Sequence, residues 1–364
     1  MKKIPIAEPD LSGKEKEYLL DALLNEKKIS ASGKYLDKFE ALGKKYFQRK
    51  FSLSCTSGTT ALHLALLALE IGPGDEVIVP VLTFAATAAV VVHCGAKPVF
   101  VDCNKDDWTL DIEELDKKLT KKTKAVIAVD LYGMPCDYDY LINWCKKNKI
   151  FLIEDAAEAH GAYYNGKPVG SFGDISCFSF YGNKILTTGE GGMCLTDDLR
   201  LYQKMKIFKN HGMKRKGLYE HEVVGYNYRL TNIQAAIGCA QFERFKEFLR
   251  KRKKIESLYK SLLSNLDFIY FRNYNKKRVR PACWLFSILI KRNINKAKEI
   301  LSQGGIDTRR FFKPLHLQNA YRVFSKKQKF PNAEYLYKYG ISLPTSVKLN
   351  EKDIKYISNI IKKL

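Results

Sequence analysis

Seven short runs of apolar, mostly β-branched residues between residues 51 and 196 constrain the fold of this chain more than any other feature. Apolar runs of this length are typical of strands that helices cover on both faces of a sheet. The segments between the first five runs are long enough for the helical crossovers that parallel strands require. We therefore predict an α/β fold with a seven-stranded, mostly parallel sheet sandwiched by helices. The predicted strands are residues 51–54, 76–80, 98–102, 125–130, 151–155, 176–180 and 192–196.

The last two runs differ from the others, because only the glycine-rich segment GNKILTTGEG joins them. A helix does not fit in this segment, so we predict that this pair of strands is antiparallel. Downstream, residues 233–265 are expected to form one long helix. A second, smaller α/β unit is predicted from a strand and two helices at 284–290, 295–305 and from Glu351 onward. The predicted domains are a large one with the N-terminal segment and a small C-terminal one, at residues 1–245 and 246–364.

The formal net charge of +23 has two interpretations. One is a polyanionic partner such as nucleic acid. The other is that lysines simply fill solvated helix faces, which their spread along the whole chain favours, so we predict no nucleic-acid partner. The nine cysteines form no C-x-x-C pair, which predicts reduced, mostly buried thiols and no metal site. No apolar run approaches the ~20 residues that span a bilayer, and the first residues lack the apolar core of a signal peptide. We expect a cytoplasmic protein that contacts no membrane.

Two stretches at the ends of predicted strands carry groups that could bind a ligand. Small hydroxyl residues and a glycine at Cys55–Thr60, ahead of an apolar helix, would leave backbone N–H groups free to hold a phosphate. The same Ser-Gly-Thr sequence also serves as a plain helix N-cap. Glu154 and Asp155 end the 151–155 strand, where ligands of open α/β sheets bind. The alternative for Asp155 is a capping or structural role.

A third stretch, Ser179–Lys184, runs from a strand through a glycine turn to a lysine. A lysine in a tight loop at a strand end is unusual in a chain that is rich in surface lysines. Partial desolvation would lower its pKa and make the amine nucleophilic. Phe84, after the 76–80 strand, could stack on a planar ligand ring or belong to the core.

Together these stretches resemble the DegT/DnrJ/EryC1/StrS family of sugar aminotransferases, which have the aspartate aminotransferase fold (fold type I). The resemblance extends over nearly the whole chain, from Ile4 to the ISLPTS segment. It implies pyridoxal 5′-phosphate (PLP) as the cofactor, with pyridoxamine 5′-phosphate as the form that carries the amino group. The motifs that carry it include TSGTTALHLAL, PVLTFAAT, IEDAAEAHGA, GDISCFSFYGNKILTTGEGG and GYNYRLTNIQAAIG.

The resemblance assigns a role to individual residues. Lys184 matches the lysine that forms the Schiff base with PLP, and Asp155 matches the carboxylate that pairs with the pyridine nitrogen. Phe84 matches the aromatic residue that stacks on the ring. Glu158 stands where many relatives have a glutamine that binds the ring hydroxyl, so this carboxylate should carry a proton or find a cationic neighbour. The residues matched to the cofactor phosphate are Gly58, Thr59, Ser179 and, from a neighbouring subunit, Asn227.

The lysine at position 184 also indicates the reaction, because a related dehydratase branch has histidine there. The resemblance therefore implies transamination in a homodimer whose active sites lie at the subunit interface. L-glutamate would donate the amino group and leave as 2-oxoglutarate, and Lys184 would move the proton. Within the family the chain is most similar to the perosamine- and viosamine-forming 4-aminotransferases, which implies a nucleotide-linked 4-keto-6-deoxyhexose as acceptor.

Two alternatives to this function stay open at the level of sequence: a 3-keto-sugar aminotransferase of the same family, and a non-catalytic, basic nucleic-acid-binding protein. The candidate substrate-binding residues carry alternatives as well. Arg309 could pair bidentately with a diphosphate or belong to a surface ion pair. His160 could lie near the sugar or be a hydrogen-bonded structural histidine. The predicted substrate-binding set is Ser30, His160, Arg309 and His316.

Overall fold

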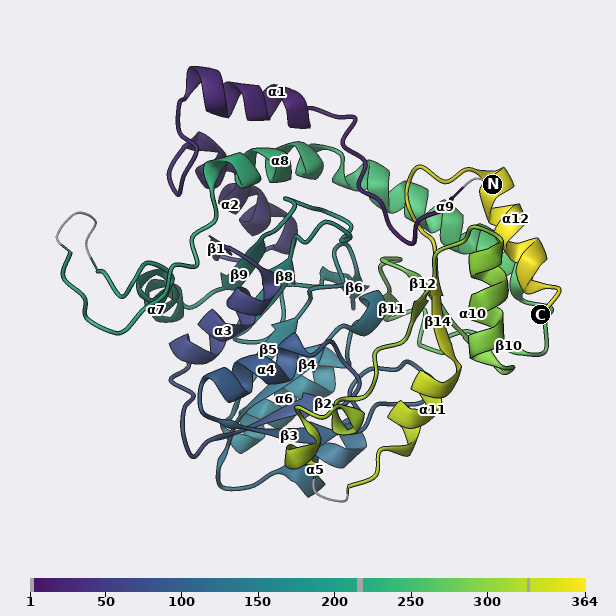
Figure 1. Cartoon of the computed structure of the whole chain (residues 1–364). Helices are drawn as coiled ribbons and strands as arrows, with labels where there is room; N and C mark the ends of the chain where they lie inside the picture. Colours follow the sequence, from purple (N-terminus) through teal and green to yellow (C-terminus); the bar gives the residue numbers. More distant parts are fainter. Residues whose placement is uncertain (1–2, 215–218, 326–327) are drawn as a thin grey trace.

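The computed structural model describes residues 3–214, 219–325 and 328–364 (Figure 1). Its centre is a seven-stranded sheet with the strand order β1-β9-β8-β5-β4-β2-β3. β9 pairs antiparallel with both β1 and β8, whereas the remaining pairs are parallel. The seven predicted strands and the antiparallel final pair are therefore confirmed. The strands are β1 (Phe51–Cys55), β2 (Glu76–Pro80), β3 (Lys97–Val101), β4 (Thr123–Val129), β5 (Phe151–Asp155), β8 (Ile175–Ser179) and β9 (Gly192–Thr196).

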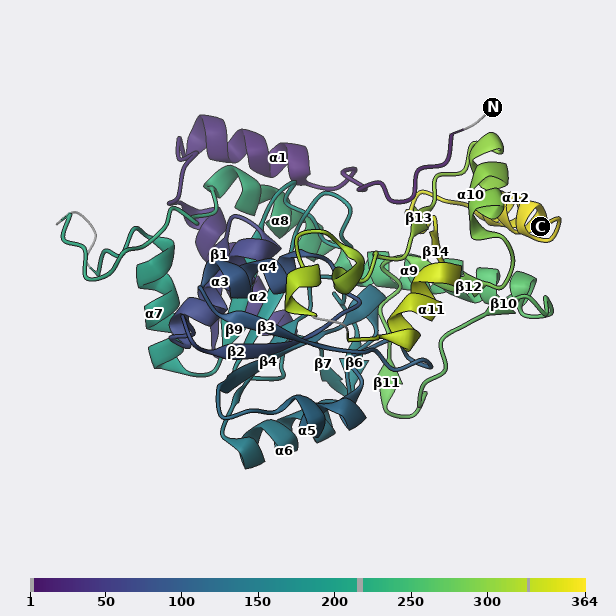
Figure 2. The ribbon, with the colours of Figure 1, turned by 60° about the horizontal axis from the view of Figure 1, so that its bottom comes forward.

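Helices cover both faces of this sheet, as its apolar strands require (Figure 2). Side chains of β2 alternate between the two faces, so Val77 and Val79 belong to one apolar cluster and Ile78 to another. The first cluster includes the buried apolar residues of α3 (Gly58–Ala68) and α4 (Ala86–His93). The second includes those of α5 (Leu115–Lys118) and α6 (Tyr138–Asn148). This layering buries every strand and leaves the ends of the strands for a ligand.

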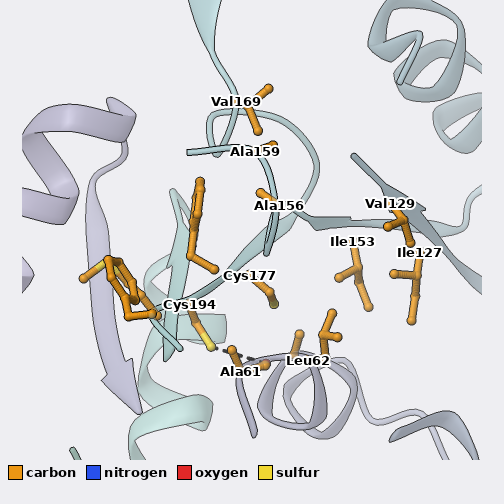
Figure 3. Close-up of a cluster of buried hydrophobic side chains, with 14 of the residues drawn as sticks. Ala61, Leu62, Ile127, Val129, Ile153, Ala156, Ala159, Val169, Cys177 and Cys194 are labelled. Atoms are coloured by element: carbon orange, nitrogen blue, oxygen red, sulfur yellow. Dashed lines mark hydrogen bonds between the residues drawn. The ribbon is translucent and has the colours of Figure 1, made fainter. Parts of the chain in front are cut away.

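The interface between α3 and the sheet is tightly packed (Figure 3). Leu62 of α3 faces Ile153 and Ile127 of the central strands, and the Cys194 thiol donates a hydrogen bond to the Ala61 carbonyl at 3.3 Å. All nine cysteines are free thiols, and eight of them are buried, as the sequence predicts. The position of α3 is thus fixed by apolar packing, which in turn fixes the loop that begins it.

Further helices and a short sheet surround this core. The helices before it are α1 (Glu15–Leu20), the π-helix η1 (Asp21–Asn25) and α2 (Lys34–Phe47). Those within and after it are the 3₁₀ turns η2 (Ile112–Glu114) and η3 (Leu131–Gly133), α7 (Leu199–Lys209), α8 (Asn232–Glu243) and α9 (Phe245–Leu263). A three-stranded sheet has the order β11-β6-β7, with β6 (Tyr163–Tyr164), β7 (Lys167–Pro168) and β11 (Val279–Arg280).

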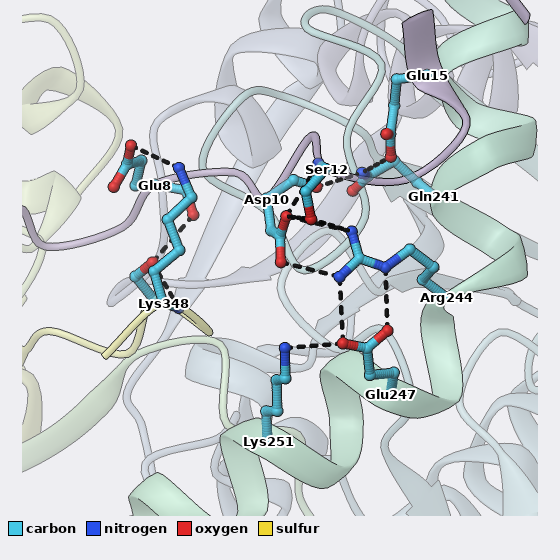
Figure 4. A network of polar contacts seen from close by, with 10 residues as sticks. Glu8, Asp10, Ser12, Glu15, Gln241, Arg244, Glu247, Lys251 and Lys348 are labelled. Atoms are coloured by element: carbon cyan, nitrogen blue, oxygen red, sulfur yellow. Dashed lines mark hydrogen bonds and ion pairs between the residues drawn. The ribbon is translucent and has the colours of Figure 1, made fainter. Parts of the chain in front are cut away.

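The prediction of one long helix over 233–265 was wrong, because the helix is interrupted at Arg244. The backbone of Arg244 leaves the helical region at φ −99° and ψ 4°, and its amide bonds to the Gln241 carbonyl. The guanidinium of Arg244 donates two bonds to Asp10 and two to Glu247 (Figure 4). These bonds tie the N-terminal segment to the break between the two helices.

The C-terminal unit is a second, smaller α/β arrangement, as predicted. Its sheet has the order β10-β12-β14-β13. Its strands are β10 (Ile269–Tyr270), β12 (Phe286–Ile290), β13 (Arg309–Arg310) and β14 (Gly340–Leu343). Its helices are α10 (Ile294–Gln303), the turns η4 (Leu315–Leu317) and η5 (Arg322–Phe324), α11 (Pro331–Tyr339) and α12 (Glu351–Ile361).

The first residues of the chain lie against this C-terminal unit, since Ile4 pairs with Ile306. The division into domains at residues 245 and 246, which falls at the start of α9, stays a proposal. Among the described residues, no helix combines the length and apolarity needed to cross a membrane.

Candidate active site

A cavity of about 500 Å³ lies at the carboxyl ends of the central strands. The segments that follow β1, β2, β4, β5 and β8 contribute to its wall, and the C-terminal unit closes it with Trp284, Arg309 and Phe312. This is the edge at which open α/β sheets bind their ligands. Eight of the twelve predicted site residues line it: Gly58, Thr59, Phe84, Asp155, Glu158, Ser179, Lys184 and Arg309.

One end of the cavity is built to bind an anion. Ser57 caps α3 by accepting a hydrogen bond from the Thr60 amide at 3.1 Å. The amides of Gly58 and Thr59 lie in the first turn of the helix, where backbone N–H groups have no partner within the helix and attract a phosphate. A Cβ atom at Gly58 would lie 2.7 Å from the Cβ of Ser179, so only glycine allows α3 to begin this close to β8. The N-cap and phosphate interpretations are thus compatible, because different residues serve them.

Lys184 lies in the loop after β8, and its side chain is only 11% exposed. Its Nζ lies 3.6 Å from Oε1 of Glu158 and 3.9 Å from the centre of the Trp284 ring. Burial lowers the pKa of Lys184, and the neighbouring Arg309 adds to this effect. The carboxylates of Glu158 and Asp155 oppose it without cancelling it. The result is a buried amine that reaches its neutral, nucleophilic form more readily than a surface lysine.

Asp155 ends β5 as a buried carboxylate. It accepts hydrogen bonds from Oγ1 of Thr87 at 2.9 Å and from the Ala157 amide at 3.3 Å. Burial raises the pKa of Asp155, while these bonds and the Lys184 charge lower it. A cationic ligand group held against Asp155 would offset the cost of burying its charge.

These groups together fit PLP. An anion site at α3, a buried carboxylate and a buried amine line one cavity. The anion site suits the phosphate of the cofactor, the carboxylate suits its pyridine nitrogen, and the amine suits its aldehyde. Phe84 lies at the mouth, 58% exposed, with its ring 5.7 Å from that of Phe312.

Glu158 is the carboxylate that was expected to carry a proton or to find a cationic neighbour, and Lys184 is that neighbour. Its Oε2 accepts a hydrogen bond from the Tyr132 amide at 2.8 Å, which leaves Oε1 facing the lysine. Burial raises the pKa of Glu158, whereas Lys184 and the Tyr132 amide lower it. Glu158 is therefore held between a backbone donor and the amine.

Replacing this carboxylate should change the acid–base behaviour of the lysine. In Glu158→Gln the nearest anion is lost, so we expect the pKa of Lys184 to fall further. In the PLP-bound protein the Lys184 nitrogen would be part of the linkage to the cofactor. The pH dependence of the visible absorption follows the proton on this nitrogen, so loss of the same anion should lower the midpoint. Glu190→Gln is the control, because Glu190 lines the same cavity but is exposed. Equal midpoints in the wild type and Glu158→Gln would contradict the assigned pairing.

Four predicted site residues lie outside the cavity wall. His160 is packed among aromatic rings, 4.9 Å from Phe178 and 5.1 Å from Phe180, and burial lowers its pKa to about 3. His316 pairs with Glu334 at 3.1 Å. Ser30 and Asn227 are exposed, and each makes a hydrogen bond outside the cavity. The Ser30 carbonyl accepts a bond from the Asn232 amide, and Asn227 Oδ1 accepts one from the Arg229 side chain.

The structure also adds residues that sequence reasoning missed. Thr87 holds Asp155, and Trp284 lies against the Lys184 amine, with its Nε1 donating to the Asn183 carbonyl at 2.8 Å. Thr87 is the one polar residue within the helix ATAAVVVH before its terminal His93, and this exception could have marked it. Trp284 carried no signal, because it reaches the site from the C-terminal unit.

Comparisons with known proteins agree with this geometry. The sequence profile of the "DegT/DnrJ/EryC1/StrS aminotransferase family" matches residues 10–362. GDP-perosamine synthase of Escherichia coli O157:H7 is 43% identical over 99% of this chain and 98% of its own length. The enzyme of the same name from Vibrio cholerae is 39% identical, with the same coverage. Spr1654 from Streptococcus pneumoniae, solved in its PLP form, has a TM-score of 0.93 at 30% identity and covers 100% of this chain and 98% of that one.

The fold and the cavity thus define a PLP-dependent aminotransferase of fold type I. More particularly, the chain belongs to the DegT/DnrJ/EryC1/StrS aminotransferase family. Spr1654 has also been solved in its PMP form, the state that carries the amino group, with the same TM-score and identity.

Proposed function

We propose that this enzyme transfers the amino group of L-glutamate to C4 of a nucleotide-linked 4-keto-6-deoxyhexose. The similarity to GDP-perosamine synthases over nearly the full length, at 39% to 43% identity, carries this proposal. The named 3-aminotransferase of Acidithiobacillus ferrooxidans, which acts on a UDP-N-acetyl-3-dehydroglucosamine, is 39% identical but over 85% of this chain. Amination at C3 is therefore the second candidate, and a nucleic-acid-binding role is not favoured. A cytoplasmic location stays a prediction.

The cofactor supplies the electron sink that allows an amino group to move between two carbon atoms. The residues of this chain do the rest. The amides of Gly58 and Thr59 and the hydroxyl of Ser179 would bind the phosphate, and Asp155 would keep the pyridine nitrogen protonated. Lys184 would hold the cofactor, take the proton from the α-carbon of glutamate, and deliver a proton to C4 of the sugar. The lowered pKa of Lys184 favours the first of these proton transfers.

Arg309 is the proposed substrate anchor. It reaches the cavity from β13, and its charge acts on both Lys184 and Glu158. A planar guanidinium at this place could bind the diphosphate of the sugar nucleotide bidentately. Ser30 and His316 stay predictions for the same substrate, whereas the burial of the His160 ring among aromatic rings favours its structural alternative.

We infer that the enzyme works as a homodimer, with Asn227 completing the cofactor site of the partner. Asn227 is exposed and absent from the cavity wall of its own chain, as a residue lent to a second subunit would be. Its neighbours Tyr226 and Tyr228 stack on each other at 4.9 Å and pack on His63 of α3, which fixes the segment that presents it.

Mixing two inactive variants tests this sharing of sites. Lys184→Ala and Asn227→Asp each spoil both sites of their own dimer, but a mixed dimer regains one intact site. Random exchange of subunits should therefore restore about a quarter of the wild-type activity. Activity equal to the mean of the two parents after exchange would refute the assignment of Asn227.

The proposed reaction is tested by supplying substrates directly. The holoenzyme and L-glutamate are incubated with one sugar nucleotide at a time: a GDP-, UDP- or dTDP-linked 4-keto-6-deoxyhexose, or a 3-keto sugar nucleotide. The products are identified by mass and NMR. An amine at C4 of one of these sugars is the expected result. Products from a 3-keto sugar nucleotide alone would establish the second candidate instead.

A further inference from the structure

The turn η3, Leu131–Gly133, follows β4 directly and has an unusual backbone. Tyr132 is a buried aromatic residue with φ 51° and ψ 32°, in the left-handed region that such residues rarely adopt. Gly133 follows with φ 80°, and a Cβ atom there would lie 2.1 Å from the Ala282 carbonyl oxygen. Backbone of this kind persists only where its surroundings enforce it, and it is concentrated at functional sites.

This backbone has a direct consequence for the catalytic lysine. The left-handed residue Tyr132 aims its amide at Oε2 of Glu158, at 2.8 Å. The other oxygen of Glu158 is thereby left 3.6 Å from the Nζ of Lys184. The orientation of the carboxylate that faces the amine therefore depends on the conformation of Tyr132.

Groups from beyond α9 hold the turn in this conformation. Arg272 donates from Nη1 to the Leu131 carbonyl and from Nη2 to the Tyr132 carbonyl, both at 3.2 Å. Its guanidinium lies 5.2 Å from the centre of the Trp108 ring, so this ring packs against the group that makes both bonds. Both prongs of the guanidinium thus act on the backbone of a single turn.

The side chain of Tyr132 adds a second attachment. Its hydroxyl accepts a hydrogen bond from the Phe312 amide at 2.9 Å, and its ring stacks on that of Phe312 with centres 5.4 Å apart. Phe312 lies three residues after Arg309, the proposed substrate anchor. One turn therefore contacts both the segment that bears Arg309 and the carboxylate that faces Lys184.

We propose that Arg272 and Tyr132 are positioning residues for Lys184, which act by holding Glu158 in place against its amine. The chain of contacts runs from Arg272 through the Tyr132 carbonyl and amide to Glu158, and from Glu158 to Lys184. It connects the C-terminal unit to the group that moves the proton. The proposal rests on the assignment of Lys184 and Glu158 but not on the identity of the sugar substrate.

The test is a titration of the holoenzyme without substrate. Lys184 is faced by the carboxylates of Glu158 and Asp155 and by the guanidinium of Arg309. Of these three groups, only Glu158 accepts a hydrogen bond from the turn itself. In Arg272→Met, Glu158 should lose its fixed position, so the midpoint of the pH-dependent visible absorption of bound PLP should fall. Arg272→Lys keeps the charge but not the two-pronged donation, and a smaller shift of the same sign is expected.

Two comparisons make the result decisive. Arg278→Met removes a charge from the same segment without touching the turn, since Arg278 bonds to Asp139 and Tyr164, and its midpoint should match the wild type. In a Glu158→Gln background, Arg272→Met should add no further shift, because the group through which it acts is already gone.

An additive shift in the double variant, or a wild-type midpoint in a folded Arg272→Met enzyme, would overturn the proposal. If Arg272→Met fails to fold, Arg272→Lys decides in the same way. If the wild-type enzyme aminates no 4-keto sugar nucleotide but the titration of the variants shifts as expected, the proposed substrate is wrong. The positioning role of Arg272 and Tyr132 is then still supported.

Discussion

Replacing Lys184 with alanine is expected to abolish transamination, with a fall in kcat of at least about 10⁴-fold. The variant loses both the amine that holds the cofactor and the group that moves the proton. No other lysine lines the cavity among the residues that the structure describes, so nothing there substitutes for it. Rates are measured with L-glutamate as donor, and the visible absorption of the PLP-bound protein should change at the same time.

Lys209→Ala is a suitable control for this variant. Lys209 is also largely buried, at 16% exposure, and donates to the Ser54 carbonyl, but it does not line the cavity. Its loss should affect stability more than chemistry. If Lys184→Ala kept substantial transamination, or if Lys209→Ala were equally inactive, the role of Lys184 would have to be abandoned.

The second large effect is expected from Asp155→Asn, which keeps the shape of the side chain but removes its charge. Without the carboxylate, the pyridine nitrogen would lose its proton and the cofactor its capacity as an electron sink. A fall in kcat of about 10²- to 10³-fold is expected, comparable with the loss of other fixed electrostatic groups. Single-turnover measurements with L-glutamate report the affected step.

Thr87→Val provides the graded comparison. It removes the hydroxyl that donates to Asp155 at 2.9 Å and leaves the carboxylate in place. Its effect should have the same sign and be much smaller than that of Asp155→Asn. A larger effect of Thr87→Val would show that position, rather than charge, is what the site requires of Asp155.

Several parts of this structure could be predicted from the sequence because their signals are local. The seven central strands are apolar on both faces, so their positions stand out within two residues of the observed bounds. The antiparallel partner β9 follows from the short segment that joins it to β8. Glycine at position 58, where α3 meets Ser179, and the lysine at 184 both lie within motifs at strand ends.

Other parts depend on packing between distant segments, which leaves no local signal. Trp284 and Arg272 reach the site from the C-terminal unit, and nothing in their sequence neighbourhoods indicates the segments that they contact. The left-handed backbone of Tyr132 could not be predicted from the sequence either, since tyrosine does not favour this conformation. No proline or glycine marks the break at Arg244, and its side chain bonds to Asp10, which is distant in the sequence.

His160 is a residue for which a sequence motif alone does not distinguish a place in the site from a place in the core. Its place in the motif after Asp155 indicated the sugar site, but its ring lies among Phe47, Phe178 and Phe180. Its pKa of about 3 keeps it uncharged, so it behaves as a core residue at neutral pH. A short motif can thus place one residue in the cavity and another in the core.

Trapping the cofactor on the protein tests the central claim most directly. The holoenzyme is treated with sodium borohydride, which reduces the linkage between PLP and its lysine to a stable amine, and is then digested and mapped by mass spectrometry. Our account predicts the phosphopyridoxyl group on the peptide that contains Lys184 and on no other. A modification at a different lysine, or none in a protein that binds PLP, would contradict it.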